Sequence, residues 1–174
     1  MINERERSGL GAALLDEALN HGLTYTHSMP VTVIVQSLAD YTHAQLVTAP
    51  GHGFVADEPR DEDGDDLGLS PYELLAAALG ACTSMTLQIY ARRKGYPVHE
   101  VAVEVEHERI HAQDCAECVD GREGLIEVLR RKIVIRGPVT EAERDDLLRI
   151  AGKCPVHKTL SSLPEVFDTI DVVA

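Results

Sequence analysis

The sequence predicts an α+β fold in which helices gather on one face of an antiparallel-rich sheet. Three features lead to this prediction. Valines alternate with glutamates over residues 98–108, which is the period-two pattern of a half-exposed strand. A capped, Leu/Ala-rich run over residues 70–95 predicts one long helix. The order along the chain is two strands, this helix, two strands, a helix and a last strand, with no internal repeat.

The sequence predicts a helical arm over residues 1–22 and a main domain over residues 23–174. Apolar residues recur at helical spacing through the arm, which we expect to pack on the domain or on a partner subunit. Two β-branched runs, residues 31–35 and 43–47, predict a hairpin. We expect residues 51–69 to form a solvated loop, because glycines, prolines and clustered carboxylates interrupt any periodicity.

The clearest predicted element is the helix over residues 70–95. Ser70 is a favourable N-cap, Pro71 stands at the first helical position, where no N–H is needed, and Glu73 completes a capping box. The run ends in basic residues followed by Gly95, as helix C-termini prefer. Its apolar residues lie on nearly every side, so we expect a central, largely buried helix.

The second half of the chain predicts two more strands, two helices and a final strand. The predicted ranges are strands at 98–108 and 125–136, a helix at 140–152, a short helix at 157–162 and a strand at 167–172. Thr140 and Glu143 form a second capping box that begins the longer helix. A loop between the two strands carries Cys115 and Cys118.

The composition excludes several classes of partner. The net charge is -13, from 29 acidic and 16 basic residues, so the surface repels phosphate backbones and anionic lipid. We therefore expect neither a nucleic-acid nor a membrane partner. No run of eighteen apolar residues occurs and the start lacks the apolar segment of a secretory signal, which favours the cytoplasm. There the four cysteines would be mostly reduced.

Cys82 and Cys154 are the first candidates for chemistry. Cys82 lies inside the central helix, where a free cysteine is most often a small buried apolar side chain. Cys154 precedes Pro155 near the start of the next helix, whose partial positive charge favours a thiolate. Reduction of a peroxide by thiols needs two such groups, because one becomes a sulfenic acid and the other condenses with it to a disulfide. The chain pattern permits this pairing without requiring it.

Two motifs resemble those of the OsmC-like family. Asp-Glu-Pro at residues 57–59 and GLSPYELLAAALGACTSMT at residues 68–86 resemble its first cysteine helix, and GKCPVHKTL at residues 152–160 resembles its second cysteine motif. The resemblance spans residues 31–173. It implies an intertwined homodimer in which long central helices pack between curved sheets. It also implies a peroxidase that acts on organic hydroperoxides in oxidative stress defence and needs no bound cofactor.

The same resemblance assigns roles to the two cysteines and a reductant to the enzyme. Cys82 would be the peroxidatic thiol and Cys154 the resolving thiol. A dithiol such as a lipoylated protein would return both to the reduced state.

The chain departs from the family's peroxidases next to the motif proline. Those enzymes place a glutamate there and pair it with an arginine that stabilises the thiolate, whereas this chain has Tyr72, and Glu73 follows one position later. Glu73 is about 13.5 Å from Cys82 along a helix, so it would reach Cys82 only from a partner subunit or across a bend. Arg60 is the nearest arginine by position. His157 has two open roles, as a group that orients or deprotonates a thiol or as a cap for a carbonyl.

Two other functions stay open. The missing glutamate is compatible with a dimer that binds an apolar or acyl ligand without turnover. The segment that follows residue 106 carries four competent zinc ligands, although their spacing is not that of a standard zinc finger. These ligands are His107, His111, Cys115 and Cys118. A disulfide between the two cysteines, or two inert thiols, would equally explain that pair.

Overall fold

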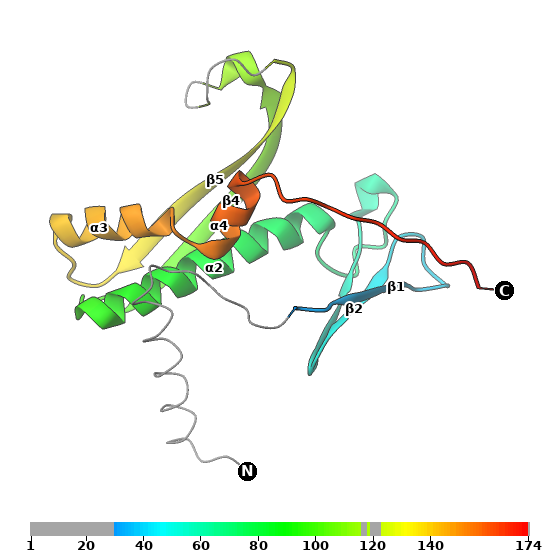
Figure 1. Ribbon diagram of the computed structural model, residues 1–174, viewed down its shortest axis with the longest axis horizontal. Helices are drawn as coiled ribbons and strands as arrows, with labels where there is room; N and C mark the ends of the chain where they lie inside the picture. The colour runs from blue at the N-terminus through cyan, green and yellow to red at the C-terminus, as the bar shows by residue number, and fades with distance from the viewer. Residues whose placement is uncertain (1–29, 116–117, 119–122, 174) are drawn as a thin grey trace, which may run out of the picture.

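The computed structural model describes residues 30–115, 118 and 123–173, so the predicted arm over residues 1–22 lies outside the described residues. The described part of the chain forms an α+β fold (Figure 1). The strands are β1 Ile34–Ser37, β2 Gln45–Ala49, β3 His52–Ala56, β4 Glu100–His111 and β5 Leu125–Arg136. The α-helices are α2 Pro71–Lys94, α3 Glu141–Ala151 and α4 Pro155–Ser161, with short 3-10 turns η1 Arg60–Glu62 and η2 Ala112–Asp114.

The strands form two antiparallel sheets. β1, β2 and β3 make a three-stranded meander, and β4 and β5 make a long hairpin. Over most of the hairpin every second residue is exposed, because successive side chains of a strand point to opposite faces. The other face is covered by helices, as the sequence predicts. At its looped end the hairpin extends beyond the helices (Figure 1).

The core lies between α2, α3 and the inner face of the β4–β5 hairpin. Its fully buried members are Leu87, Ala91, Leu147, Ile150 and Ala151, and the hairpin adds Val101, Ile133 and Ile135. Gly80 lets α2 approach the hairpin closely, since a Cβ there would lie 3.3 Å from a methyl group of Val105. Ser84 Oγ also donates a hydrogen bond to the carbonyl of Val101 at 3.1 Å. α2 is therefore held against β4 along this flank.

The ends of α2 agree with the prediction. Ser70 and Glu73 form the reciprocal capping box, and Gly95 ends the helix with φ +70°. The expectation of a largely buried helix is wrong for the single chain, because Tyr72 and Met85 are more than half exposed. By length and composition alone α2 would be able to cross a membrane, a test that the core helix of a soluble protein also passes.

Two predictions about strands are wrong. β3 lies within residues 51–69, which were expected to form a loop. Backbone pairing with β2, from Gln45 opposite Ala56 to Ala49 opposite His52, defines this strand, and its side-chain pattern does not reveal it. Residues 167–172 pair with no described strand, and Ile170 is 90% exposed. A strand needs a neighbour for its backbone groups, and the described chain offers none there.

Candidate dithiol site

The start of α4 brings Cys154 against Cys82 in the middle of α2. Cys154 is the N-cap of α4 and is fully buried, whereas Cys82 is partly exposed. Both are free thiols, and they lie within hydrogen-bonding distance of each other. Pro155 keeps the preceding residue out of helical geometry, which separates α4 from α3 and turns the chain at Cys154. Two sulfurs remote in the sequence thus share one site.

The surroundings of Cys82 act on its ionisation in opposite directions. Burial, followed by the neighbouring Cys154 thiol, raises the pKa of Cys82 above its ordinary value of 9.0. Hydrogen bonds from the backbone N–H of Val156 and the hydroxyl of Thr86 lower the pKa in part. The raising effects prevail, so Cys82 in the single chain is mainly a thiol at neutral pH. The two donors are nevertheless in place to stabilise an anion on this sulfur.

Arg131 lies at the junction of the elements that carry the two cysteines. This β5 residue stands opposite Val105, on the face of the hairpin that the helices cover. Its Nη1 donates hydrogen bonds to Thr83 Oγ1 at 2.8 Å and to the Ala151 carbonyl at 3.1 Å. Its Nη2 lies 3.1 Å from Nδ1 of His157. One guanidinium therefore contacts α2, the end of α3 and α4.

The contact with Arg131 fixes the protonation of His157. A guanidinium has only donors, so Nδ1 of His157 must accept the hydrogen bond and the neutral ring carries its proton on Nε2. Desolvation and the charge of Arg131 both lower the pKa of His157, which keeps the ring neutral. Neither nitrogen is then free to take a proton from a thiol. In this arrangement His157 orients the site and does not act as a base.

The other predicted supporting residues lie elsewhere. Glu73 accepts a hydrogen bond from the Ser70 backbone N–H at 2.8 Å, so its carboxylate caps α2. Tyr72 stacks on the ring of His107 with centroids 4.3 Å apart. Arg60 is an exposed residue of η1, and its contacts do not include either cysteine. Arg131 instead contacts Thr83, Ala151 and His157, which lie close in sequence to the two cysteines.

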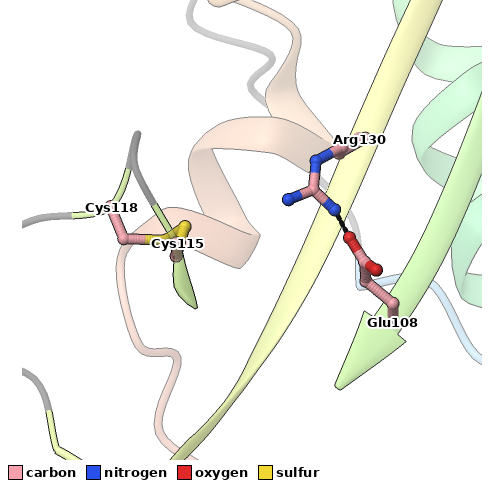
Figure 2. Close-up of a disulfide and its surroundings, with 4 residues drawn as sticks. All are labelled: Glu108, Cys115, Cys118 and Arg130. Atoms are coloured by element: carbon pink, nitrogen blue, oxygen red, sulfur yellow. Dashed lines mark ion pairs between the residues drawn. A yellow bond between two sulfur atoms is a disulfide. The ribbon is translucent and has the colours of Figure 1, made fainter. Parts of the chain in front are cut away.

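The possible zinc ligands are engaged in other interactions. Cys115 and Cys118 form a disulfide with Cα atoms 5.4 Å apart, so neither sulfur is available as a thiolate (Figure 2). His107 Nε2 lies 2.8 Å from a carboxylate oxygen of Glu127, and His111 is an exposed residue at the end of β4. Among the residues that the structure describes, no group of three or more His, Cys, Asp or Glu is placed to hold a metal.

The sequence contained a signal for Arg131 that its interpretation as a plain strand overlooked. Ile133 and Ile135 face the core, and a period of two places Arg131 on the same face. A basic residue in line with two core isoleucines indicates a partly buried cation. The contacts with Thr83 and His157 had no such signal, because they depend on how the helices pack.

Several solved structures share this fold. An OsmC like protein from Mycoplasma pneumoniae gives a TM-score of 0.61 at 20% identity, over 78% of this chain and 89% of that chain. An organic hydroperoxide resistance protein OsmC from Legionella pneumophila gives 0.57 at 15% identity, over 77% and 90%. The organic hydroperoxide resistance protein OhrB of Bacillus subtilis gives 0.55 at 16% identity, over 78% and 93%. At these identities the likeness shows the fold alone. No curated protein sequence matches the chain.

A family profile covers the candidate site itself. The profile described as OsmC-like protein matches residues 63–166, which is more than half of the chain. This range contains α2 with Cys82, the β4–β5 hairpin with Arg131, and the α3–α4 junction with Cys154. The motifs, the fold and the profile agree, and the chain belongs to the OsmC-like protein family.

Proposed function

We propose that this protein is a thiol peroxidase that reduces organic hydroperoxides in oxidative stress defence. The observation that carries the proposal is the meeting of the free thiols of Cys82 and Cys154 in one site. The names of two proteins of similar fold support the choice of substrate, since both are organic hydroperoxide resistance proteins. Cys82 is the attacking thiol, because it is partly exposed whereas Cys154 is fully buried.

The cycle balances with two thiols and one external dithiol. The Cys82 thiolate attacks the terminal oxygen of the hydroperoxide, the O–O bond breaks, and the alkoxide takes a proton to leave as an alcohol. Cys82 is thereby oxidised to a sulfenic acid. The Cys154 sulfur then displaces the hydroxyl group, which leaves as water, and a disulfide forms. A cellular dithiol, for example the lipoyl group of a lipoylated protein, reopens this disulfide by two exchange steps and is oxidised in turn.

The proposal includes a homodimer that works in the cytoplasm. Apolar side chains are exposed on the β1–β3 sheet, on one flank of α2 and on the C-terminal tail. These side chains include Ile34, Val35, Phe54, Met85, Phe167 and Ile170. An open groove of about 290 Å³ between α2 and β4 adds to this surface, and its lining includes neither cysteine. A second copy of the chain would cover these surfaces, and the reducing cytoplasm would keep the catalytic thiols available.

Substitution of each thiol tests the proposed roles. Cys82→Ser is expected to lower the rate of cumene hydroperoxide consumption by about 10³-fold or more, because the nucleophile is lost. Cys154→Ser is expected to consume about one equivalent per chain and then stop, because the sulfenic acid cannot be resolved. Peroxide loss is followed with a dithiol reductant in excess.

A double variant, Cys115→Ser with Cys118→Ser, is the matched control for the loss of two sulfurs outside the site. It is expected to turn over at the normal rate. Normal turnover by Cys82→Ser would overturn the mechanism. If the wild-type protein loses thiols to peroxide no faster than its unfolded chain, the peroxidase proposal fails and the alternative of a non-catalytic ligand-binding dimer takes its place.

A further inference from the structure

We infer that Arg131 is the positioning residue of the dithiol site, which holds Cys82 and Cys154 in register and supplies the positive charge beside them. The inference rests on the proposed dithiol chemistry. It gives this role to a β5 residue, whereas Arg60, before α2, is the nearest arginine by position in the sequence.

The hydrogen bonds of Arg131 lie on both sides of Cys154 and next to Cys82 in the sequence. Thr83 directly follows Cys82 on α2, and its buried hydroxyl accepts from Arg131 while donating to the Leu79 carbonyl at 2.7 Å. Ala151 and His157 stand three residues before and three residues after Cys154, and both accept from the same guanidinium. A single planar group thus fixes the backbone on each side of Cys154 relative to the helix that carries Cys82. Loss of these bonds would leave α4 free to shift against α2.

The neighbours of Arg131 on β5 show that its orientation is specific. Arg130 and Lys132 point to the solvent face of the hairpin. Arg130 pairs there with Glu108 of β4 (Figure 2), and Lys132 pairs with Glu104. Arg131 points to the helices, and within the described part of the chain no carboxylate lies at ion-pair distance from its guanidinium. Its charge is therefore uncompensated by the residues around it.

An uncompensated cation beside two thiols favours their anionic forms. Arg131 does not contact Cys82 directly and acts through Thr83 and through space, where partial burial weakens screening by solvent. The titratable groups that the structure places against this site are Arg131 from β5, His157 from α4 and the two thiols. Because His157 remains neutral, Arg131 carries the positive charge alone. This positive charge stabilises both the Cys82 thiolate and the hydroxide that leaves the Cys82 sulfenic acid.

A purely structural role would not need an arginine. Methionine has a similar length and would continue the apolar face of Ile133 and Ile135. The tests therefore use Arg131→Met, which removes the charge and all three hydrogen bonds, and Arg131→Lys, which keeps the charge on a side chain that cannot span three acceptors. Arg130→Met is the control, since it removes the same charge from the adjacent residue on the opposite face.

The first readout is closure of the Cys82–Cys154 disulfide by diamide, a thiol oxidant that needs no peroxidase activity. Arg131→Met is expected to close at least about tenfold more slowly than the wild-type protein, and Arg130→Met at the wild-type rate, measured by thiol titration and peptide mass. The disulfide of Arg131→Lys is expected to form slowly as well. A lysine ammonium cannot make the three hydrogen bonds by which the Arg131 guanidinium joins α2 to the chain on both sides of Cys154.

The second readout is the pH profile of alkylation of Cys82 by iodoacetamide, measured in a Cys154→Ser background. Arg131→Met is expected to move this profile to higher pH, and Arg131→Lys is expected to restore it, which a merely structural residue would not do. Wild-type closure and an unchanged profile in Arg131→Met overturn the inference. If Arg131→Met does not fold, Arg131→Lys decides, because closure at the wild-type rate in that variant overturns the positioning role.

These readouts also separate the inference from the proposed function. A protein that consumes no hydroperoxide but closes its disulfide in an Arg131-dependent way refutes the peroxidase and leaves the role of Arg131 standing. If the protein is a peroxidase, but neither the rate of disulfide closure nor the pH profile of Cys82 alkylation changes when Arg131 is substituted, only the inference about Arg131 is refuted.

Discussion

At the scale of single residues, the dithiol site balances burial against donors. Burial of Cys82 raises its pKa, so the resting thiol is protected from ionisation and from adventitious oxidation. The Val156 N–H and the Thr86 hydroxyl favour the anion, and we infer that the charge of Arg131 behind Thr83 adds to their effect. The two hydrogen-bond donors therefore offset part of the effect of burial on the Cys82 thiolate.

The sequence predicted the two sulfurs better than the groups around them. Cys82 and Cys154 stand in recognisable motifs, and the structure brings them together. Arg131 was detectable in principle from the period-two pattern of its strand. The contact between Arg131 and His157 depends on the packing of α4, which no local pattern encodes. Tertiary contacts of this kind are beyond what local sequence patterns predict.

Asp146 provides a residue-scale test of how α2 and α3 are held together. Its carboxylate accepts hydrogen bonds from the hydroxyls of Tyr90 at 2.7 Å and Tyr96 at 3.0 Å, and it pairs with Arg149. The bond from Tyr90, then that from Arg149, lowers the pKa of Asp146 from 3.8 to about 2. A carboxyl whose pKa is lower in the folded state stabilises the fold above pH 3.8 and loses this effect as the pH falls toward 2.

We therefore expect Asp146→Asn to be less stable than the wild-type protein near pH 6 and to approach it near pH 2. Urea unfolding at a series of pH values measures the difference. Asp145→Asn is the matched control, because the Asp145 carboxylate pairs with the neighbouring Arg144 and has no hydrogen bond with a tyrosine in the described part of the chain. A gap between Asp146→Asn and the wild-type protein that stays constant from pH 6 to pH 2 would contradict the assignment.

At the scale of elements, the sequence predicted the helices, whose ends depend on nearby residues, better than the strands, which depend on distant partners. α2 and α3 begin at their predicted capping boxes, since the capping side chains bind the backbone of the same turn. β3 and the predicted strand at 167–172 failed for a shared reason, because a strand is defined by its partner. β3 has β2 as a neighbour in spite of its weak pattern, and residues 167–172 have the pattern without a described neighbour.

Gly137 shows how closely two connections pack at one end of the hairpin. It follows β5 with φ +145°, a conformation that residues with a side chain avoid, and an added Cβ would lie 2.0 Å from the Pro97 carbonyl oxygen. We expect Gly137→Ala to lower the free energy of unfolding by about 2–4 kcal/mol, because strain adds to a clash with backbone. Denaturant unfolding measures this loss.

Gly95→Ala is the control for this substitution. Gly95 also has a positive φ, +70°, but an added Cβ meets nothing within 4 Å. Its expected loss is about 1 kcal/mol, from the left-handed conformation alone. Equal losses in the two variants would show that the contact with Pro97 does not constrain the end of the hairpin.

At the scale of the whole molecule, the described chain exposes large apolar side chains in three places. α2 packs on the hairpin along one flank and leaves Met85 61% exposed on the other. Phe167 and Ile170 of the tail are about nine-tenths exposed, and Phe54 is exposed on the separate β1–β3 sheet. Isolated apolar residues on a surface are ordinary, but large apolar side chains exposed on a helix flank, a sheet and a tail favour a protein partner that covers them.

We expect the protein to have twice the mass of its 19.0 kDa chain in solution, because a second copy would bury these surfaces. Light scattering after gel filtration measures the mass. Met85→Glu, which places a charge on the exposed flank of α2, is expected to shift the protein toward the monomer at micromolar concentration. Leu148→Glu is its control, since Leu148 is similarly exposed, at 65%, on α3. A wild-type protein that is monomeric at all concentrations would contradict the dimer. Equal dissociation by both variants would show that the flank of α2 is not a specific dimer contact.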